Sequence, residues 1–302
     1  MTDGHVSHIS GVVFLDKPQG WTSRHAVNEI SRIFGRIKAG HAGTLDPLAT
    51  GMLPILLGEA TRFAGFGLDS DKAYEVCIDL SRQTDTLDLE GKETGTYQVE
   101  IEDTQLQQAI AKMQGKQEQL PPDYSAIRIQ GKRAHELARS GKAFELTPRH
   151  INIDEIRLLD WNSPLLKLFV HCSKGTYIRA LARDIGTRLG VGGCVTSLRR
   201  LSCGGWPAEA MLDIETIRQT GRDAVVPLAK WLGHLPRVEL ARDLALRFMQ
   251  GQRLPLGNQD QDEAVTVFAE GTLLGTGTVK PGFSGQVLHP VRVLSSAQEL
   301  LA

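Results

Sequence analysis

The residues whose types and spacing could do chemistry are concentrated between Lys38 and Gly51, which read Lys-Ala-Gly-His-Ala-Gly-Thr-Leu-Asp-Pro-Leu-Ala-Thr-Gly. Glycines let a backbone approach a ligand closely, and ligand-contacting residues are common on loops. Asp46 precedes Pro47 and so cannot readily be α-helical, which places its carboxylate in a fixed extended or turn conformation. A carboxylate held in this way can act as a nucleophile, as a base or as a stabiliser of positive charge.

Two other interpretations of this segment stay open on the residues alone. One is an Asp-Pro turn whose carboxylate only accepts hydrogen bonds. The other is a phosphate loop, although neither Gly-x-x-x-x-Gly-Lys-Ser/Thr nor Gly-x-Gly-x-x-Gly occurs here. His41 could likewise contact a ligand or simply satisfy a loop carbonyl.

The elements that must position this loop follow from hydrophobic periodicity and from turn residues. Helices are predicted over residues 23–34, 104–113 and 176–189, with Thr22 or Ser23 as a cap and with Gly35 and Gly190 as stops. Residues 37–51 are predicted to form a loop. Strands are predicted over 11–16, 52–57, 73–80, 151–159 and 165–172. Because strands and helices do not alternate regularly, we predict an α+β fold around a central, largely antiparallel mixed sheet flanked by helices.

A change in composition near residues 233–236 marks a predicted domain boundary. After it we expect a helix over 238–250 and strands over 263–269, 272–279 and 286–294, separated by Gly-containing turns. The sequence therefore predicts a larger domain over residues 1–235 and a small β-rich domain over 236–302.

The composition excludes several classes of protein. Among 302 residues, 34 basic and 35 acidic side chains give a formal charge of −1, and hydrophobic residues make up 41%, which is typical of globular proteins and not of collagen, coiled coils or disordered chains. The longest apolar runs are far shorter than a membrane span, and residues 1–10 do not resemble a signal peptide. The four cysteines form no Cys-x-x-Cys pair, so we expect buried thiols in a cytoplasmic protein and no metal cluster.

The near-zero net charge conceals an uneven distribution along the chain. Basic residues outnumber acidic ones by six to three over residues 17–62, by six to three over 121–150 and by seven to one over 167–200, whereas eleven acids accompany three bases over 69–103. Three basic segments could fold into one positive face, as a phosphate backbone requires. The alternative is that each segment is an ordinary solvated surface of mixed charge.

Several blocks of sequence resemble motifs of one enzyme family. The segment Gly40-His-Ala-Gly-Thr-Leu-Asp-Pro-Leu-Ala-Thr-Gly51 resembles the catalytic motif of the TruB-type pseudouridine synthases. The other blocks follow in family order: Leu15-Asp-Lys-Pro-Gln-Gly-Trp-Thr-Ser23, Lys72-Ala-Tyr74, Pro121-Pro-Asp-Tyr-Ser-Ala126 with Gly131-Lys-Arg133, Lys174-Gly-Thr-Tyr-Ile-Arg179, and Leu198-Arg-Arg-Leu201. Any single block would be a weak signal, but several blocks in order are highly specific.

The resemblance implies a pseudouridine synthase fold with a PUA-like C-terminal domain. It also implies an isomerase that converts uridine 55 in the T-loop of tRNA to pseudouridine after flipping the base, without cofactor or metal. Residues 1–235 would then be the catalytic domain, with an RNA-gripping insertion over about 121–150, and residues 236–302 an RNA-binding domain. We expect a cytoplasmic monomer with no membrane association and no obligate protein partner.

The same resemblance assigns roles to individual residues. Asp46 would be the nucleophile and Arg179 its carboxylate partner, since a guanidinium favours the ionised form of a carboxylate. The base-binding residues would be His41, Tyr74, Tyr177 and Leu198. The contacts to the RNA backbone would be Lys17, Arg128, Lys132, Arg133, Arg139 and Lys142. On the residues alone, Tyr74 could be an ordinary strand aromatic and Tyr177 a core contact at a helix start. Arg128 and His135 stand where the family more often has Lys and Tyr, which affects only details of the RNA grip.

Two alternatives to a tRNA-modifying enzyme stay open. A non-catalytic tRNA-binding or tRNA-folding protein could use the same scaffold. Replacing Asp46 would distinguish it from an enzyme, because the enzyme would lose turnover whereas the function of a binding protein would change little. The archaeal and eukaryotic ribonucleoprotein relatives share these motifs but would carry longer, charged extensions, so we expect neither guide RNA nor protein partners here. Whether Asp46 attacks C1′ or abstracts a sugar proton is not decided by the residues.

Overall fold

The computed structural model describes residues 9–125, 127–129, 131–140, 144–256, 263–282 and 285–297. The helices are α1 (Ser23–Ile33), α2 (Ala64–Leu68), α3 (Asp103–Ala111), α4 (Ala134–Arg139), α5 (Ile178–Leu189), α6 (Ile214–Thr220), α7 (Leu228–Trp231) and α8 (Arg242–Met249), with short 3-10 turns at Gly58–Phe63 (η1), Ala208–Ala210 (η2) and Gly221–Ala224 (η3). The strands of the first 235 residues are β1 (Gly11–Lys17), β2 (Ala39–His41), β3 (Thr50–Leu57), β4 (Lys72–Asp79), β5 (Arg82–Thr84), β6 (Glu93–Thr96), β7 (Gly115–Gln119), β8 (Arg128–Ile129), β9 (Lys132–Arg133), β10 (Arg149–Asn162), β11 (Leu165–Cys172), β12 (Cys194–Cys203) and β13 (Val226–Pro227). The strands that follow are β14 (Arg237–Glu239), β15 (Leu254–Leu256), β16 (Ala264–Ala269), β17 (Thr272–Gly282) and β18 (Gly285–Val293).

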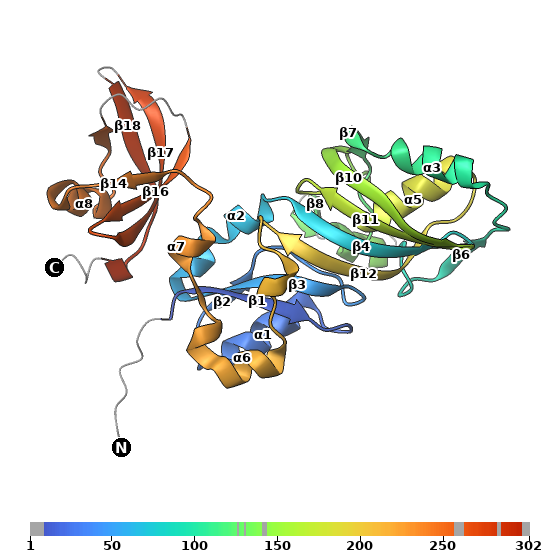
Figure 1. The fold of residues 1–302 in the computed structure, drawn as a ribbon, viewed down its shortest axis with the longest axis horizontal. Coiled ribbons are helices and arrows are strands. Elements are labelled where there is room, and N and C mark those ends of the chain that lie inside the picture. Colours follow the sequence, from blue (N-terminus) through green and yellow to red (C-terminus); the bar gives the residue numbers. More distant parts are fainter. Residues whose placement is uncertain are drawn as a thin grey trace.

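One large sheet dominates the described part of the chain. Its strand order is β13-β1-β3-β12-β4-β11-β10-β7, with β2 paired to β3 at one side. Every pairing in this sheet is antiparallel except that of β12 with β3. Helices lie beside it, α1 and α6 near β1–β3 and α3 and α5 near β10–β12 (Figure 1). The predicted α+β fold with a largely antiparallel sheet is confirmed.

The hydrophobic core lies on both faces of the central strands. Alternate residues of β1 and β3 belong to two different clusters: Val13 and Ile55 pack on one side, while Phe14 and Leu56 pack on the other. The first cluster continues under α1 and α5, and the second continues into the C-terminal strands. Strands β1 and β3 are therefore buried on both faces, so β3 is a rigid support for the loop that precedes it.

The C-terminal strands form a second, five-stranded sheet in the order β14-β16-β17-β18-β15, with α8 packed beside it (Figure 1). This unit is attached to η1, which directly follows β3. The carboxylate of Glu59 accepts hydrogen bonds from the backbone N–H groups of Ser295 (2.8 Å) and Ser296 (2.9 Å), and Arg62 donates to the carbonyl of Val293 (2.7 Å). The predicted β-rich C-terminal unit is confirmed.

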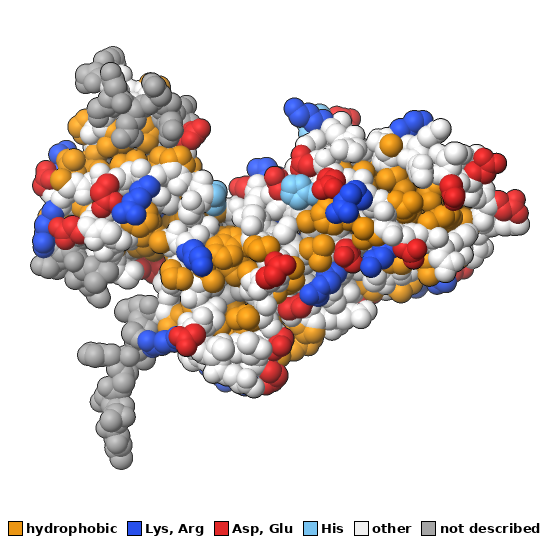
Figure 2. Space-filling model, viewed as in Figure 1, with side chains coloured by type: hydrophobic (Ala, Val, Ile, Leu, Met, Phe, Trp, Pro, Cys, Tyr) orange, Lys and Arg blue, Asp and Glu red, His pale blue; other side chains and the backbone are white. Residues whose placement is uncertain are grey.

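A cleft of about 820 Å³ separates the two units next to this attachment and is visible as a hollow in Figure 2. Its walls include Arg62, Phe66, Asp71, His171, His234 and Arg292. None of Asp46, Tyr74 and Arg179 lines it. No helix within the described residues is long and apolar enough to cross a membrane.

Local sequence signals explain the helices that matter for the site. Thr22 caps α1, because its hydroxyl accepts a hydrogen bond from the N–H of His25, and the chain leaves the helix through Gly35 at φ 76°. Helix α5 ends at Gly190, which adopts the left-handed conformation that glycine permits (φ 73°). Its start differs slightly from the prediction: Tyr177 is the residue before the first helical turn, and α5 begins at Ile178.

The secondary structure differs from the prediction in several places. The loop over 37–51 contains β2, whose Ala-Gly-His sequence has no strand pattern and which is extended because it pairs with β3. Strand β12 was missed because two register shifts and a buried arginine break its alternation. The helix over 238–250 starts later, at Arg242, because residues 237–239 pair with β16 as β14; β15 was also missed.

Candidate active site

The loop between β2 and β3 is fixed from three sides. The hydroxyl of Ser23, the first residue of α1, donates to the carbonyl of Leu45 (2.9 Å) and accepts from its N–H (2.8 Å). The N–H of Gly20 donates to the carbonyl of Pro47, and the N–H of Ala49 closes a turn onto the carbonyl of Asp46. Asp46 is therefore held at a defined position, while its side chain keeps 38% of its surface exposed.

The carboxylate of Asp46 meets a buried arginine from the first turn of α5. Arg179 Nε lies 2.9 Å from Asp46 Oδ2, and the arginine side chain is only 8% exposed. The other guanidinium nitrogens of Arg179 donate to the carbonyls of Thr86 (2.7 Å) and Tyr124 (3.0 Å). The guanidinium is thus oriented by the protein, and one carboxylate oxygen of Asp46 is anchored while the side chain stays accessible to a substrate.

A second carboxylate on the same guanidinium was missed by the sequence reasoning. Asp88 Oδ2 lies 3.5 Å from Arg179 Nε, and the side chain of Asp88 is 3% exposed. Its Oδ1 accepts hydrogen bonds from the Thr86 hydroxyl (2.6 Å) and the Glu90 N–H (3.0 Å). Asp88 lies among eleven acids between residues 69 and 103, and nothing in its spacing distinguishes it from the others.

The position of Lys17 differs from the prediction. We predicted that it contacts the RNA backbone, but its side chain is completely buried, so it cannot reach a phosphate. Its ammonium donates to the carbonyls of Pro18 (2.9 Å) and Trp21 (2.7 Å), which lie in the turn that supports the Asp46 loop. Burial lowers the pKa of Lys17 to about 8, although the charge of Asp46 opposes the shift.

Tyr74 and Arg200 face each other across the centre of the sheet. Tyr74 on β4 is directly opposite Arg200 on β12, and the charge of Arg200 acts on the Tyr74 side chain. Both are buried, with 8% and 1% of their surface exposed. Burial raises the pKa of Tyr74 to about 12, so its hydroxyl stays neutral near pH 7.

The remaining base-binding candidates lie on elements that adjoin the loop. Tyr177 precedes α5, and its N–H and carbonyl both bond the side-chain amide of Gln119 (2.9 and 3.1 Å). Leu198 lies on β12, buried beside β3. His41 is the last residue of β2. Its Nδ1 is buried and has no hydrogen-bond partner among the described residues, so the histidine does not donate to a loop carbonyl through this atom. Burial, with the charge of Arg200, lowers the pKa of His41.

The predicted RNA-gripping cations lie mostly outside what can be described. Arg128, Lys132 and Arg133 belong to the β8–β9 hairpin, and Arg139 ends α4. The side chains of these four residues and the whole of Lys142 lie outside the described part of the chain. The hairpin follows Tyr124, whose carbonyl bonds Arg179, so the insertion begins directly beside Asp46.

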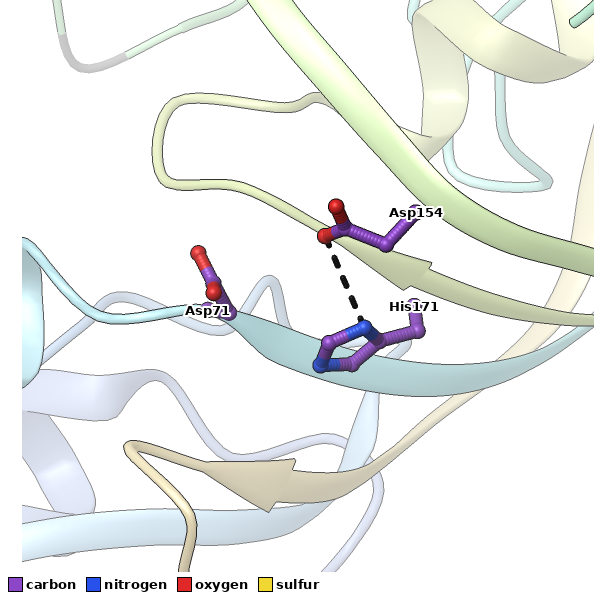
Figure 3. Close-up of side chains that lie close together, drawn as sticks. All are labelled: Asp71, Asp154 and His171. Carbon is purple, nitrogen blue, oxygen red and sulfur yellow. Dashed lines mark ion pairs between the residues drawn. The ribbon is translucent and has the colours of Figure 1, made fainter. Parts of the chain in front are cut away.

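Within the described residues, one group of side chains has metal-ligand character, and it consists of three residues that are not among the candidates above (Figure 3). Asp71 precedes β4, Asp154 lies on β10 and His171 on β11, with ligand atoms within 4.8 Å of one another. His171 Nδ1 lies 3.5 Å from Asp154 Oδ2, and all three side chains are at least partly exposed. Exposed groups of this kind also form without an ion, so the cluster does not indicate a metal-dependent reaction.

Comparison with known proteins identifies the protein family of this chain. Residues 31–178 match the model of the TruB family pseudouridylate synthase N-terminal domain, residues 179–228 that of the tRNA pseudouridylate synthase B C-terminal domain, and residues 236–294 that of the pseudouridine synthase II TruB C-terminal domain. A curated tRNA pseudouridine synthase B from Dechloromonas aromatica (strain RCB) is 41% identical over 295 residues, covering 96% of this chain and 97% of the relative. The chain belongs to the TruB family. It is therefore a pseudouridine synthase, which is an isomerase.

Further relatives of the TruB family agree with this assignment. A tRNA pseudouridine synthase B from Chromohalobacter salexigens is 40% identical over 296 residues and covers 96% of this chain and 95% of the relative. The crystal structure of a Cbf5-Nop10-Gar1 complex contains a chain with a TM-score of 0.74 and 25% identity, covering 96% of this chain and 85% of that one. The predicted family, pseudouridine synthase fold and enzyme class are confirmed.

Proposed function

We propose that this TruB enzyme converts uridine 55 in the T-loop of tRNA to pseudouridine, with Asp46 as the essential carboxylate. The curated relatives described above, named tRNA pseudouridine synthase B, match nearly the full chain, which supports tRNA as the substrate. The observation that carries the catalytic proposal is the pair formed by Asp46 and Arg179: a half-exposed carboxylate in a fixed loop, anchored through one oxygen by a buried guanidinium.

The reaction needs one carboxylate and no redox chemistry. In the proposed sequence Asp46 attacks ribose C1′ as the bond from C1′ to uracil N1 breaks, and the electron pair of that bond leaves with the base. The base turns, its C5 attacks C1′, and the Asp46 carboxylate is released. The C5 proton is then lost while N1 gains one, so that atoms and charge balance. This is the logic of covalent glycoside cleavage with carbon as the second nucleophile.

The alternative role for Asp46, abstraction of a sugar proton, makes a different prediction. Deuterium at the sugar carbon that loses the proton slows turnover if Asp46 acts as a base there, and has no such effect if Asp46 attacks C1′ without touching that proton. Both roles need an ionised carboxylate.

The surrounding residues are proposed to hold the flipped base. Extruding a base from a folded loop costs a few kcal/mol, and stacking on an aromatic ring returns roughly 1–3 kcal/mol. We assign the stacking surface to Tyr74 and the pocket walls to Tyr177 and Leu198. His41, at the start of the catalytic loop, would fill the space that the base vacates in the tRNA.

The insertion over residues 121–150 and the C-terminal unit are proposed to grip the RNA backbone. Lys132, Arg133, Arg139 and Lys142 supply charge without reading bases, as most phosphate contacts do. We propose residues 1–235 as the catalytic domain, with residues 236–302 as a PUA-like domain that adds RNA contacts. The enzyme would act in the cytoplasm as a monomer, with no obligate protein partner.

An unmodified tRNA transcript tests the proposal directly. After incubation with the protein, pseudouridine is mapped by chemical labelling and primer extension, and the expected product is a single modification at position 55. A transcript with cytidine at position 55 serves as the matched control and should stay unmodified. Tight binding of the transcript without any product would favour the non-catalytic tRNA-binding protein, and product at another uridine would overturn the assignment of position 55.

A further inference from the structure

Arg200 is a deeply buried arginine beneath the Asp46 loop, with 1% of its surface exposed. Its Nε donates to the carbonyl of Met52 (2.6 Å), and its two terminal nitrogens approach the carbonyls of Thr44 (3.4 Å) and Gly43 (3.2 Å). No carboxylate lies within ion-pair distance of its guanidinium among the described residues. A buried charge without a counter-ion is costly, so its hydrogen bonds must be well made and hard to replace.

The partners of Arg200 come from both halves of the proposed site. Two of the carbonyls belong to residues 43–44, which lie two and three positions before Asp46 in the same loop. Tyr74, on the neighbouring strand, is the residue directly opposite Arg200 and feels its charge. One rigid, planar group thus joins the segment that carries the catalytic carboxylate to the ring proposed to stack on uracil.

The backbone of the loop is shaped around this side chain and its strand. Gly51 has φ 95°, and a Cβ there would lie 2.2 Å from the carbonyl oxygen of Arg200. Gly43 has φ 133°, and a Cβ there would lie 3.4 Å from one terminal nitrogen of Arg200. Both glycines lie at the ends of the catalytic loop, so the loop is closed onto Arg200 at both ends.

We propose that Arg200 is a positioning residue for catalysis: it sets the distance and orientation between Asp46 and the Tyr74 ring, because it bonds the loop carbonyls from the strand position directly opposite Tyr74. Arg200 itself touches neither substrate nor reacting atoms. A small displacement of reacting groups can cost on the order of 100-fold in rate, so the effect belongs in the chemical step and not in tRNA affinity.

The test compares the variants Arg200→Lys, Arg200→Met, Tyr74→Phe and the double variant Tyr74→Phe/Arg200→Lys under single-turnover conditions. Arg199→Met is the matched control: it changes the neighbouring arginine of β12, whose guanidinium instead bonds Asp16 at 2.9 and 2.7 Å. For each variant the thermal midpoint, the tRNA dissociation constant and the single-turnover rate are measured.

We expect the rate of Arg200→Met to fall by about tenfold or more with an unchanged tRNA dissociation constant, and Arg200→Lys to recover part of that loss. Tyr74→Phe should also lower the rate, and the double variant should lose less than the product of the two single losses, because both remove one interaction. The proposal would be overturned by wild-type single-turnover rates in both Arg200→Lys and Tyr74→Phe. It would also be overturned if the double variant lost as much rate as the product of the two single losses, or if only the tRNA dissociation constant changed.

Two further comparisons allow the experiment to be interpreted if an Arg200 variant does not fold or if the proposed function is wrong. If neither Arg200 variant folds, Tyr74→Phe decides by itself, since it removes the hydroxyl without disturbing the buried cation. The inference rests on the proposed function, and Asp46→Asn in the same assay separates the two. A normal rate in Asp46→Asn rejects the proposed function, whereas a loss there together with wild-type rates in the other variants rejects only the role of Arg200.

Discussion

The guanidinium of Arg179 is shared with a buried carboxylate that never reaches solvent: Asp88 Oδ2 lies 3.5 Å from Arg179 Nε, on a side chain that is 3% exposed. Asp46 uses the same nitrogen at 2.9 Å but stays partly exposed. Two carboxylates around one cation have different tasks in this arrangement. Asp88 supports Arg179 from within the protein, and in the proposed function Arg179 presents Asp46 to the substrate.

Replacing Asp88 by Asn should therefore reduce catalysis without abolishing tRNA binding. Arg179 loses a charged partner, and its misplacement would lower kcat by on the order of 100-fold. Because a buried pair is broken, the free energy of unfolding should also fall, by up to about 3–5 kcal/mol. Turnover, tRNA affinity and denaturant unfolding are measured together, with Glu93→Gln as an exposed control in the same acidic segment. Equal kcat in both variants would show that Asp88 does not act through Arg179.

Asp46→Asn should fold, bind tRNA and make no product. Asn is nearly isosteric, so the turn at Pro47 keeps its shape, but a neutral amide is neither a nucleophile nor a base near pH 7. Binding is expected to persist because cations outside the loop supply it. Thermal melting must accompany the assay, since Arg179 loses one partner and keeps Asp88. More than a trace of pseudouridine, after deamidation to Asp has been excluded, would remove Asp46 from its role.

Neutralising Lys132, Arg133 and Arg139 together should weaken tRNA binding and flatten its salt dependence. Each lost phosphate contact changes the slope of log K against log salt by about 0.7–0.9, so three contacts change it by roughly 2–3. A triple variant at Lys112, Arg218 and Arg222 has the same change in net charge at exposed positions outside the insertion, and serves as the control. The same slope in both triple variants would show that the insertion does not touch RNA.

The buried Lys17 should make the free energy of unfolding increase at alkaline pH. Its pKa in the folded state is lowered to about 8 from 10.5, mainly by burial, so between these values the unfolded chain binds more protons than the folded one. Stability then rises with pH over this window, at no more than about 1.4 kcal/mol per pH unit, and the gain is complete above the unfolded pKa. Lys17→Met should lack this rise, whereas the exposed control Lys116→Met should retain it. Denaturant unfolding from pH 7 to 10.5 measures the difference, and parallel curves for wild type and Lys17→Met would contradict it.

Glu59 should make the attachment of the C-terminal unit sensitive to acid. Burial opposes ionisation, but the hydrogen bonds from Ser296 and Ser295 outweigh it and lower the pKa of Glu59 below its usual value. The contribution is therefore present above the unfolded pKa and is lost as pH falls through the folded pKa. Hydrogen exchange of the amides of Ser295 and Ser296 should accelerate in Glu59→Gln at pH 7, and in the wild type only in acid. Glu209→Gln, an exposed control, should leave both amides protected.

The parts of the fold that were predicted correctly are those with local signals. Helix α1 has a hydroxyl cap and a terminal glycine, and the strands over 73–80 and 165–172 alternate. Strand β12 has two register shifts and turns Arg200 inward, so no alternation can be read from its residues. Its place in the sheet is determined by pairing with β3 and β4, which lie more than a hundred residues away.

The residues of the candidate site likewise fall into those that could be predicted from the sequence and those that could not. Asp46 and Arg179 could be named because each lies in a recognisable block, and the ion pair between them is formed in the structure. Asp88 could not, because its importance depends on one long-range contact among many similar acids. Lys17 was assigned to the RNA backbone by the family resemblance, whereas in the structure the chain folds back at Trp21 and encloses the ammonium with its own carbonyls.

The parallel pairing of β12 with β3 has a consequence for the order in which the protein folds during synthesis. Thr50 and Gly51, at the end of the catalytic loop, pair with Arg199 and Arg200, which are synthesised about 150 residues later. Contacts of such high sequence separation form slowly, because the entropy of closing the intervening chain is lost before the contact is gained. During translation the Asp46 loop therefore emerges long before the strand that closes it, and a nascent chain that ends before β12 has Asp46 but lacks the rest of the candidate site.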